Sequence, residues 1–300
     1  MTGQQRLLIF GCGYLGERVA RRWHALQRPV IAVTRSAERA ADWQSRGWLP
    51  VVADVGDPST LRGLPEADTV LFAIGYDRQG SYSQRAIYVD GLAAVLEAMK
   101  NRCRRFLYVS SSSVYGQHDG EWVDETSPCE PTQPGGQLCL EAEALVHAAF
   151  SAPGTGVVLR FAGIYGPDRL LSRIESLRTG QPLTGRPDAW LNLIHVDDGA
   201  TAVIAAAEAA QPSDCYLVSD DAPVPRGDYY RHLAAMVHAP PPTFDETTPS
   251  PRGSGGLNKR CRNVRIHKEL VPHWRFPTYR EGLANALGYP SSAPTGPKSS

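Results

Sequence analysis

The stretch Leu7-Leu8-Ile9-Phe10-Gly11-Cys12-Gly13-Tyr14-Leu15-Gly16 decides the fold of this chain. Its four leading apolar residues predict a buried strand, and a Gly-x-Gly-x-x-Gly turn joins them to a helical pattern. Gly11 permits the tight turn, Gly13 lets the backbone approach a pyrophosphate, and Gly16 lets the helix pack closely on the strand. The stretch therefore predicts a dinucleotide site; the alternative is a glycine turn without a ligand.

The end of the second predicted strand indicates which dinucleotide is bound. An NAD-specific site would place an acidic residue there, about 20 residues past the glycines, to hold the ribose 2′-hydroxyl. The sequence instead reads Thr34-Arg35-Ser36, in which a guanidinium suited to a 2′-phosphate stands without a carboxylate. NADP is therefore predicted over NAD; the alternative is that Arg35 is a solvated loop residue.

The composition favours a globular enzyme and gives no sign of a nucleic-acid or membrane partner. The 300 residues are 42% hydrophobic, and 31 basic side chains balance 31 acidic ones, so the whole chain carries no charge that would attract nucleic acid. No apolar run approaches the length of a membrane span, and no secretory leader precedes the first strand. We therefore expect a cytoplasmic protein with a small-molecule partner.

The six cysteines form no metal-like pattern. They are scattered along the chain, with neither a Cys-x-x-Cys pair nor a zinc-like Cys/His cluster. We therefore expect reduced thiols that serve mainly in packing, and we predict no metal site.

Strand and helix patterns alternate along the chain, as a parallel sheet with crossover helices requires. The predicted fold class is α/β, a doubly wound parallel Rossmann sheet with a smaller C-terminal substrate cap. Because crossovers are right-handed, the strand ends should open on the edge where ligand binds. The expected strands are 7–10, 29–33, 48–52, 69–72, 105–109 and 156–160, and the expected helices are 17–25, 82–99 and 200–210.

Several further motifs follow the glycine turn in a fixed order. They are Asp54-Val55-Gly56-Asp57, Ala73-Ile74-Gly75, Val109-Ser110-Ser111-Ser112-Ser113-Val114-Tyr115-Gly116, Leu159-Arg160-Phe161-Ala162-Gly163-Ile164-Tyr165-Gly166-Pro167 and Ile194-His195-Val196-Asp197-Asp198. With this order the chain, to about Gly288, resembles the extended short-chain dehydrogenase/reductase superfamily, which includes nucleotide-sugar epimerases and dehydratases.

The resemblance implies roles for these motifs. Asp54 and Val55 would contact the adenine, residues 73–75 the ribose and phosphates, and Ser111 the reacting oxygen. The segment from Phe161 to Ile164 would lie beside the nicotinamide. Together with the glycine turn, the predicted cofactor-binding residues are Gly11, Gly13, Tyr14, Leu15, Gly16, Thr34, Arg35, Ser36, Asp54, Val55, Ala73, Ile74, Gly75, Phe161 and Ile164.

One departure from the family pattern bears on catalysis. Members that carry out chemistry have Tyr-x-x-x-Lys on a helix after the active serine; aligned on Glu143, this pattern places Gly135 at the tyrosine and Cys139 at the lysine. The tyrosine transfers a proton although its reference pKa is about 10, and the lysine charge favours the phenolate. Tyr88 also replaces a family asparagine. The chain resembles an atypical subgroup that lacks the Tyr-x-x-x-Lys pair.

Other side chains are candidate acids, bases or substrate contacts. Ser111 is a candidate catalytic hydroxyl, or the four-serine run forms a capped turn. Tyr115 is a candidate catalytic phenol and Tyr165 a candidate substrate contact, because both stand beside glycines at strand ends. The alternative is that both rings cover the core. His195 is a candidate base, or a structural histidine before a helix that Asp197 caps.

The chain divides into two predicted lobes and a tail. The NADP-binding Rossmann domain is expected at 5–168 and 190–210, the substrate-binding cap at 169–189 and 211–290, and a disordered tail at 291–300. Residues 240–256 are rich in Pro, Gly, Ser and Thr and predict a loop over the cleft.

The clearest basic concentration runs from Asn258 to Lys268. Lys259 and Arg260 in it are candidate contacts to an anionic substrate such as a nucleotide-sugar, or the segment is a solvated helix face.

Two function hypotheses remain. The first is an NADP(H)-dependent oxidoreductase or epimerase that acts on a sugar-like or nucleotide-linked carbonyl or alcohol with a non-standard active site. The second is a non-catalytic NADP(H)-binding sensor or regulatory protein, which the absence of the tyrosine and lysine favours. A homodimer is also a possible partner state, because dimers are common in the family that the chain resembles.

Overall fold

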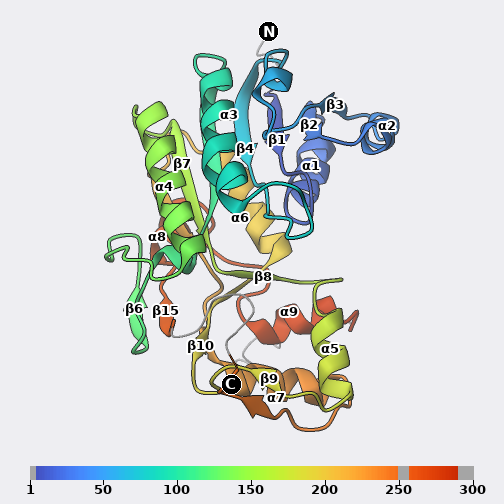
Figure 1. The fold of residues 1–300 in the computed structure, drawn as a ribbon, viewed down its shortest axis with the longest axis vertical. Helices are drawn as coiled ribbons and strands as arrows, with labels where there is room; N and C mark the ends of the chain where they lie inside the picture. The colour runs from blue at the N-terminus through green and yellow to red at the C-terminus, as the bar shows by residue number, and fades with distance from the viewer. Residues whose placement is uncertain (1–4, 249–256, 290–300) are drawn as a thin grey trace, which may run out of the picture.

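The core of the molecule is a seven-stranded parallel sheet in the upper lobe of Figure 1. The computed structural model describes residues 5–248 and 257–289. The strands of this sheet are β1 (Leu7–Phe10), β2 (Val30–Thr34), β3 (Leu49–Val52), β4 (Ala67–Phe72), β5 (Cys103–Ser111), β7 (Gly156–Phe161) and β12 (Cys215–Val218). Their order is β12-β7-β5-β4-β1-β2-β3, and every neighbouring pair is parallel. The order reverses at β1, so a crevice opens at the carboxyl ends of the strands.

Helices cover both faces of this sheet, which explains its continuous apolar strands (Figure 1). Leu7 and Ile9 of β1 face the core shared with α1 and α6, whereas Leu8 and Phe10 face the core shared with α3 and α4. This alternation follows from the two-residue period of a strand. The bounds are α1 (Gly16–Ala25), α2 (Ala37–Ser45), α3 (Gly91–Met99), α4 (Pro134–Ala149) and α6 (Val196–Glu208). The predicted doubly wound fold is therefore confirmed.

The helix predicted at 82–99 begins later and irregularly. A π-helical turn, η2 (Ala86–Asp90), leads into α3 and carries Tyr88. Such turns are rare, and they are often found at functional sites.

A buried arginine ties β5 to α6. Arg105 is 1% exposed, and its guanidinium donates to the carbonyls of Ala206, Ala207 and Ala209 at 2.7–2.9 Å. It donates also to the Gly154 carbonyl at 2.9 Å and to the Ala210 carbonyl. The positive charge therefore meets the carbonyl end of α6, where the helix dipole favours it.

A buried ion pair joins α4 to the middle of the sheet. Arg160 of β7 donates through Nε and Nη2 to both carboxylate oxygens of Glu143, at 2.7–3.1 Å, and Ser110 of β5 donates to the same carboxylate at 2.5 Å. The third nitrogen of Arg160, Nη1, donates to the Tyr115 hydroxyl at 3.0 Å. The Glu143 and Arg160 side chains are 3% and 10% exposed, so little solvent reaches this network.

The lower lobe of Figure 1 is a smaller cap with an apolar core of its own, which includes Leu177, Tyr229 and Leu283. The elements outside the main sheet and its helices are η1 (Pro58–Leu61), η3 (Ser112–Val114), β6 (Glu121–Val123), β8 (Gly163–Tyr165), α5 (Leu171–Arg178), β9 (Leu183–Thr184), β10 (Trp190–Leu191), β11 (Leu193–His195), β13 (Val224–Pro225), α7 (Arg226–Met236), β14 (Phe244–Asp245), β15 (Lys259–Cys261), α8 (Val264–Glu269) and α9 (Tyr279–Ala286).

The predicted lobe boundary is wrong after residue 210. β12 lies within 211–290 but is an edge strand of the main sheet, and Ile266 and Trp274 belong to the core that contains α1 and α6. The segment from Asn258 is not a solvated helix face, because it begins as β15, which pairs with β6. Residues 249–256 of the predicted loop and the tail at 291–300 lie outside the described residues. None of the helices in the described ranges is long and apolar enough to cross a bilayer.

Candidate functional site

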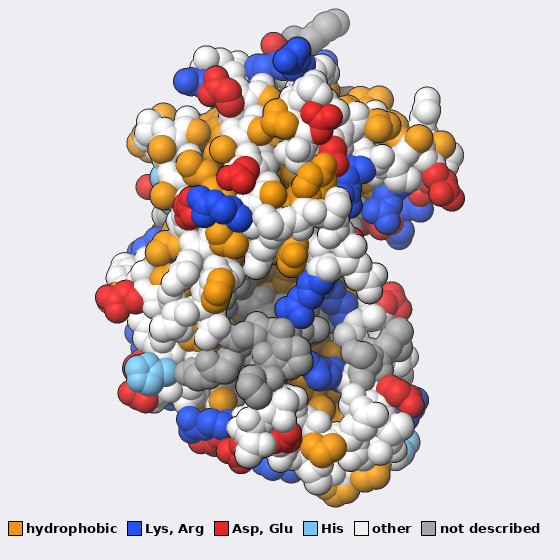
Figure 2. Space-filling view, viewed as in Figure 1, with side chains coloured by type: hydrophobic (Ala, Val, Ile, Leu, Met, Phe, Trp, Pro, Cys, Tyr) orange, Lys and Arg blue, Asp and Glu red, His pale blue; other side chains and the backbone are white. Residues whose placement is uncertain are grey.

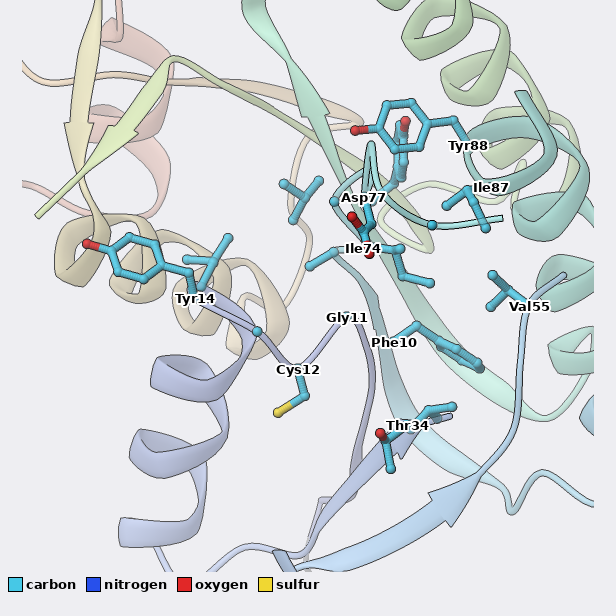
Figure 3. A pocket seen from close by; sticks show the side chains of 18 of the residues that line it. Phe10, Gly11, Cys12, Tyr14, Thr34, Val55, Ile74, Asp77, Ile87 and Tyr88 are labelled. Carbon is cyan, nitrogen blue, oxygen red and sulfur yellow. The ribbon is translucent and has the colours of Figure 1, made fainter. Parts of the chain in front are cut away.

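A cavity of about 620 Å³ lies over the carboxyl ends of β1, β2, β4 and β5 (Figure 3). It is placed where the reversal of strand order predicts a ligand. The predicted residues that line it are Gly11, Gly13, Tyr14, Leu15, Thr34, Arg35, Asp54, Val55, Ala73, Ile74, Gly75, Ser111, Phe161 and Ile164.

The glycine turn has the geometry that a dinucleotide requires. Gly11 has a φ of +85°, and a Cβ there would lie 2.4 Å from the Ala73 backbone. A Cβ on Gly16 would lie 2.4 Å from the Gly11 carbonyl oxygen, so this glycine permits the close packing of α1 and does not itself line the cavity. A Cβ on Gly13 would meet nothing within 4 Å. The open space beside Gly13 fits a pyrophosphate at the N-terminus of α1.

Two arginines stand at the mouth of the cavity beside the end of β2. Arg35 lines the cavity as predicted, and Arg39, in the first turn of α2, lines it as well. Ser36 has a different role, because its hydroxyl accepts the Arg39 backbone N–H at 3.2 Å and caps α2. Arg39 is not among the predicted residues, although its place in the first turn of a helix after Arg35 is a usable signal in the sequence.

Arginines also flank Tyr14. The guanidinium groups of Arg18 and Arg169 lie 4.3 and 4.2 Å from the centre of its ring, and its hydroxyl donates to the Pro167 carbonyl at 2.8 Å. Arg169 also lines the cavity, although it is not among the residues predicted from the sequence. Figure 2 shows basic side chains at the hollow between the two lobes.

The inner end of the cavity is lined by Ser111, Tyr108, Cys139 and Tyr88. Cys139 lies at the place where the family pattern expects a lysine, and burial raises the pKa of its thiol to about 11, so the thiol is neutral at physiological pH. The Ser111 hydroxyl accepts the Ser113 backbone N–H at 3.1 Å, which caps η3 and leaves its proton free to donate.

A second cavity, of about 410 Å³, continues from the first into the cap. Ser111, Phe161 and Ala162 line both cavities. Lys259 and Arg226 line the second one from the cap side. The structure therefore places a cofactor-sized cavity and a smaller cavity on either side of one wall.

Two basic side chains of the second cavity, Lys259 and Arg226, have no carboxylate partner within the described residues, whereas Arg186 of the same cavity pairs with Asp188 at 2.5 Å. Lys259 is 5% exposed, and burial lowers the pKa of its ammonium group. The Arg226 Nε is buried with no hydrogen-bond partner in the described part of the chain, and this charge sits at the N-terminus of α7, the positive end of the helix dipole. Neither residue forms an ion pair within the described ranges, although Glu246 lines the same cavity. Both positions are unfavourable for a cation unless an anion binds.

Three predicted contacts point elsewhere. The Tyr115 hydroxyl is buried against Arg160, so Tyr115 is not a catalytic phenol in this cavity. The Tyr165 hydroxyl donates to the Thr278 carbonyl at 3.4 Å in the cap core. Arg260 follows Lys259 on a strand and therefore faces the other side, where it donates to the Gly120 carbonyl at 2.7 Å.

His195 has a structural role. It is the N-cap of α6, in place of the predicted Asp197: its Nδ1 accepts the Asp197 backbone N–H at 3.2 Å. The side chain is fully buried, and this burial lowers the pKa of the imidazole to about 4. His195 is therefore neutral at pH 7 and loses its capping bond if Nδ1 takes up a proton.

Acid is expected to destabilise the protein through this histidine. The folded pKa lies below the ordinary value of 6.5, so the unfolded chain binds more protons as the pH falls from 6.5 toward 4, and stability is lost in that window. His195→Asn keeps a capping oxygen without a titrating group, so it should lose about 2–3 kcal/mol less than wild type between pH 7 and pH 4.5 in urea unfolding. The exposed His118→Asn is the matched control, and equal acid sensitivity of all three proteins would contradict this account.

The fold and the joined cavities define a Rossmann-type protein with a dinucleotide cavity beside a second cavity in a cap. Residues 7–218 match the NAD dependent epimerase/dehydratase family, and the chain belongs to this family. The resemblance found in the sequence is thereby confirmed.

Relatives extend over nearly the whole chain. Protein YeeZ of Escherichia coli K12 is 29% identical over 282 residues, which are 91% of this chain and 97% of that protein. A 3-diazoavenalumate denitrifying reductase of Streptomyces is 27% identical over 308 residues and covers 92% of this chain and 100% of that protein. A solved structure of a functionally unknown conserved protein from Silicibacter pomeroyi is 32% identical, with a TM-score of 0.75, and covers 95% of this chain and 98% of that one.

Proposed function

We propose that this protein transfers a hydride between NADP(H) and a small anionic substrate. The observation that carries the proposal is the wall shared by the two cavities, formed by Ser111, Phe161 and Ala162. A substrate in the second cavity meets the cofactor cavity at this wall, which is the proximity that a reaction between two bound molecules requires. A sugar-like or nucleotide-linked carbonyl or alcohol suits this place.

Membership of an NAD-dependent family supports the cofactor class, and the full-length Streptomyces relative, named a reductase, supports oxidoreductase chemistry. The preference for NADP rests on Arg35 and Arg39 at the end of β2, since a guanidinium pairs well with a 2′-phosphate. No carboxylate takes the ribose-holding position among residues 34–36.

The anionic character of the substrate rests on Lys259 and Arg226. Both groups line the second cavity without ion-pair partners within the described residues. An anion bound between them would relieve the cost of burying the ammonium group and the unfavourable helix-end charge.

Lys259→Met is expected to stabilise the ligand-free protein and to remove its response to anions. An unpaired buried charge costs about 1–3 kcal/mol, and methionine keeps most of the side-chain volume. With NADPH present, UDP-glucose or inorganic pyrophosphate should raise the melting temperature of wild type but not of Lys259→Met, and Arg226→Met should also weaken this response.

Arg260→Met is the matched control, because Arg260 neighbours Lys259 but does not line the cavity. It should respond to the anions as wild type does. Loss of the response in Arg260→Met alone would place the anion site on the other side of β15. NADPH binding without any anion response would overturn the anionic substrate and favour the non-catalytic sensor.

A further inference from the structure

We propose that Tyr88 donates the proton at this site, in place of the tyrosine and lysine that the sequence lacks at positions 135 and 139. The inference rests on the proposed hydride transfer and names a residue for its proton step. It is carried by the position of Tyr88 on the π-helical turn η2 and by the contacts of its oxygen.

Tyr88 extends from η2 into the cofactor cavity (Figure 3). Its ring packs in the cluster that contains Cys139, and the Cys139 thiol is surrounded by Tyr108, Ser113 and the backbone of Ser111. Ser111 belongs to the wall shared with the second cavity. The Tyr88 phenol therefore lies at the end of the cofactor cavity that adjoins the substrate cavity.

One N–H group holds the Tyr88 oxygen, and an amide lies close to it. The Tyr76 backbone N–H donates to this oxygen at 3.1 Å; burial raises the pKa of Tyr88, and the nearby Gln84 side-chain amide acts to lower it. A phenol oxygen has two lone pairs and one proton, so accepting from Tyr76 leaves the O–H free to donate. The same groups would stabilise the phenolate once the proton has left.

The missing tyrosine leaves room for this arrangement. A Cβ on Gly135 would lie in ordinary van der Waals contact with the Gln84 side chain, at 3.4 Å, so position 135 adjoins the amide beside Tyr88 and glycine places no ring there. Cys139 is also small, and the Tyr88 ring packs against the apolar cluster that contains it.

The chemical step balances with these groups. Reduced nicotinamide, when bound, would supply a hydride to a substrate carbonyl carbon. Tyr88 would give its proton to the carbonyl oxygen, where the π electron pair of the C=O bond forms the new O–H bond. The remaining phenolate recovers a proton from water. Burial raises the pKa of Tyr88, so the phenol is protonated at neutral pH, as a donor requires.

Tyr88 also anchors the loop after β4 through Tyr76, so a test has to separate donation from anchoring. In protein labelled with [ζ-¹³C]tyrosine, the Tyr88 signal is the one lost in Tyr88→Phe. A positive charge within about 4–6 Å lowers a phenol pKa by about 1–3 units, and the oxidised nicotinamide carries that charge while the reduced one does not. We expect the Tyr88 pKa to be lower with NADP⁺ than with NADPH by about this amount, whereas a phenol that anchors the loop away from the nicotinamide would not respond to the redox state.

Gln84→Leu removes the nearby amide and should raise the Tyr88 pKa in both cofactor states, while the exposed Gln79→Leu should not. Tyr115, paired with Arg160 inside the protein, serves as an unchanging reference signal. Cofactor fluorescence in the same samples separates two failures. Absence of NADPH binding would overturn the proposed function, and binding with a Tyr88 pKa independent of redox state would overturn the role of Tyr88 alone.

Discussion

Arg160→Met is expected to lower the free energy of unfolding by about 3–5 kcal/mol, because it leaves the Glu143 carboxylate buried without its cation. Arg160 makes three hydrogen bonds to this carboxylate and one to Tyr115. Ser110 alone would remain as a donor to Glu143. Urea unfolding at pH 7 measures the loss.

The matched control is Arg85→Met, which breaks a pair with Glu141 of similar geometry at the surface, where the two side chains are 55% and 43% exposed. An exposed pair of this kind contributes about 0–1 kcal/mol. Replacing both partners, as Arg160→Met with Glu143→Leu, should recover much of the loss. An equal loss of unfolding free energy in Arg160→Met and Arg85→Met would show that burial does not increase the cost of breaking the Arg160 pair.

Arg35→Asp is expected to reverse the cofactor preference from NADPH to NADH. The change removes a charge-assisted contact to the 2′-phosphate, worth about 1.5–3 kcal/mol, and supplies a carboxylate that can accept from the ribose 2′-hydroxyl. Together these effects should change the ratio of the two dissociation constants by about 10²–10⁴-fold. Fluorescence titration of both reduced cofactors gives the ratio directly.

Arg104→Asp is a suitable control for the altered net charge, because Arg104 is exposed near the amino end of β5, away from the cavity. It should leave the ratio unchanged, and Arg39→Ala should weaken NADPH binding without creating an NADH preference. Equal affinity of wild type for the two cofactors would refute the NADP assignment.

The central sheet is predictable from the sequence because its signal is local. Runs such as Leu7–Phe10 and Gly156–Phe161 are buried on both faces, so each is recognisable without knowledge of its neighbours. The residues that follow these strands line the cofactor cavity because parallel strands end at one edge. The glycine turn is equally local, since Gly11 and Gly16 meet steric limits within the turn and beside the adjacent strand, and Gly13 borders open space.

The second cavity is not predictable in this way. The sequence leaves Lys259 either as a contact to an anionic substrate or as a solvated charge, because its burial depends on the pairing of β15 with β6, which is far away along the chain. Tyr115 and Tyr165 illustrate the opposite error: both follow promising motifs, yet tertiary contacts turn them into the interior. The role of Tyr88 depends on Tyr76 and Gln84, and no local pattern shows that three such groups converge.

The contact between Arg105 and the end of α6 has a consequence for how this protein tolerates substitution. All five acceptors of its guanidinium are main-chain carbonyls, which any residue type supplies. The hydrogen bonds therefore place no requirement on the side chains at 206–210, which only packing restricts, whereas Gly154 is fixed by its φ of +74°. Arg105 is the one side chain that this attachment requires. Substitutions can therefore accumulate at the end of α6, while residue 105 must stay arginine.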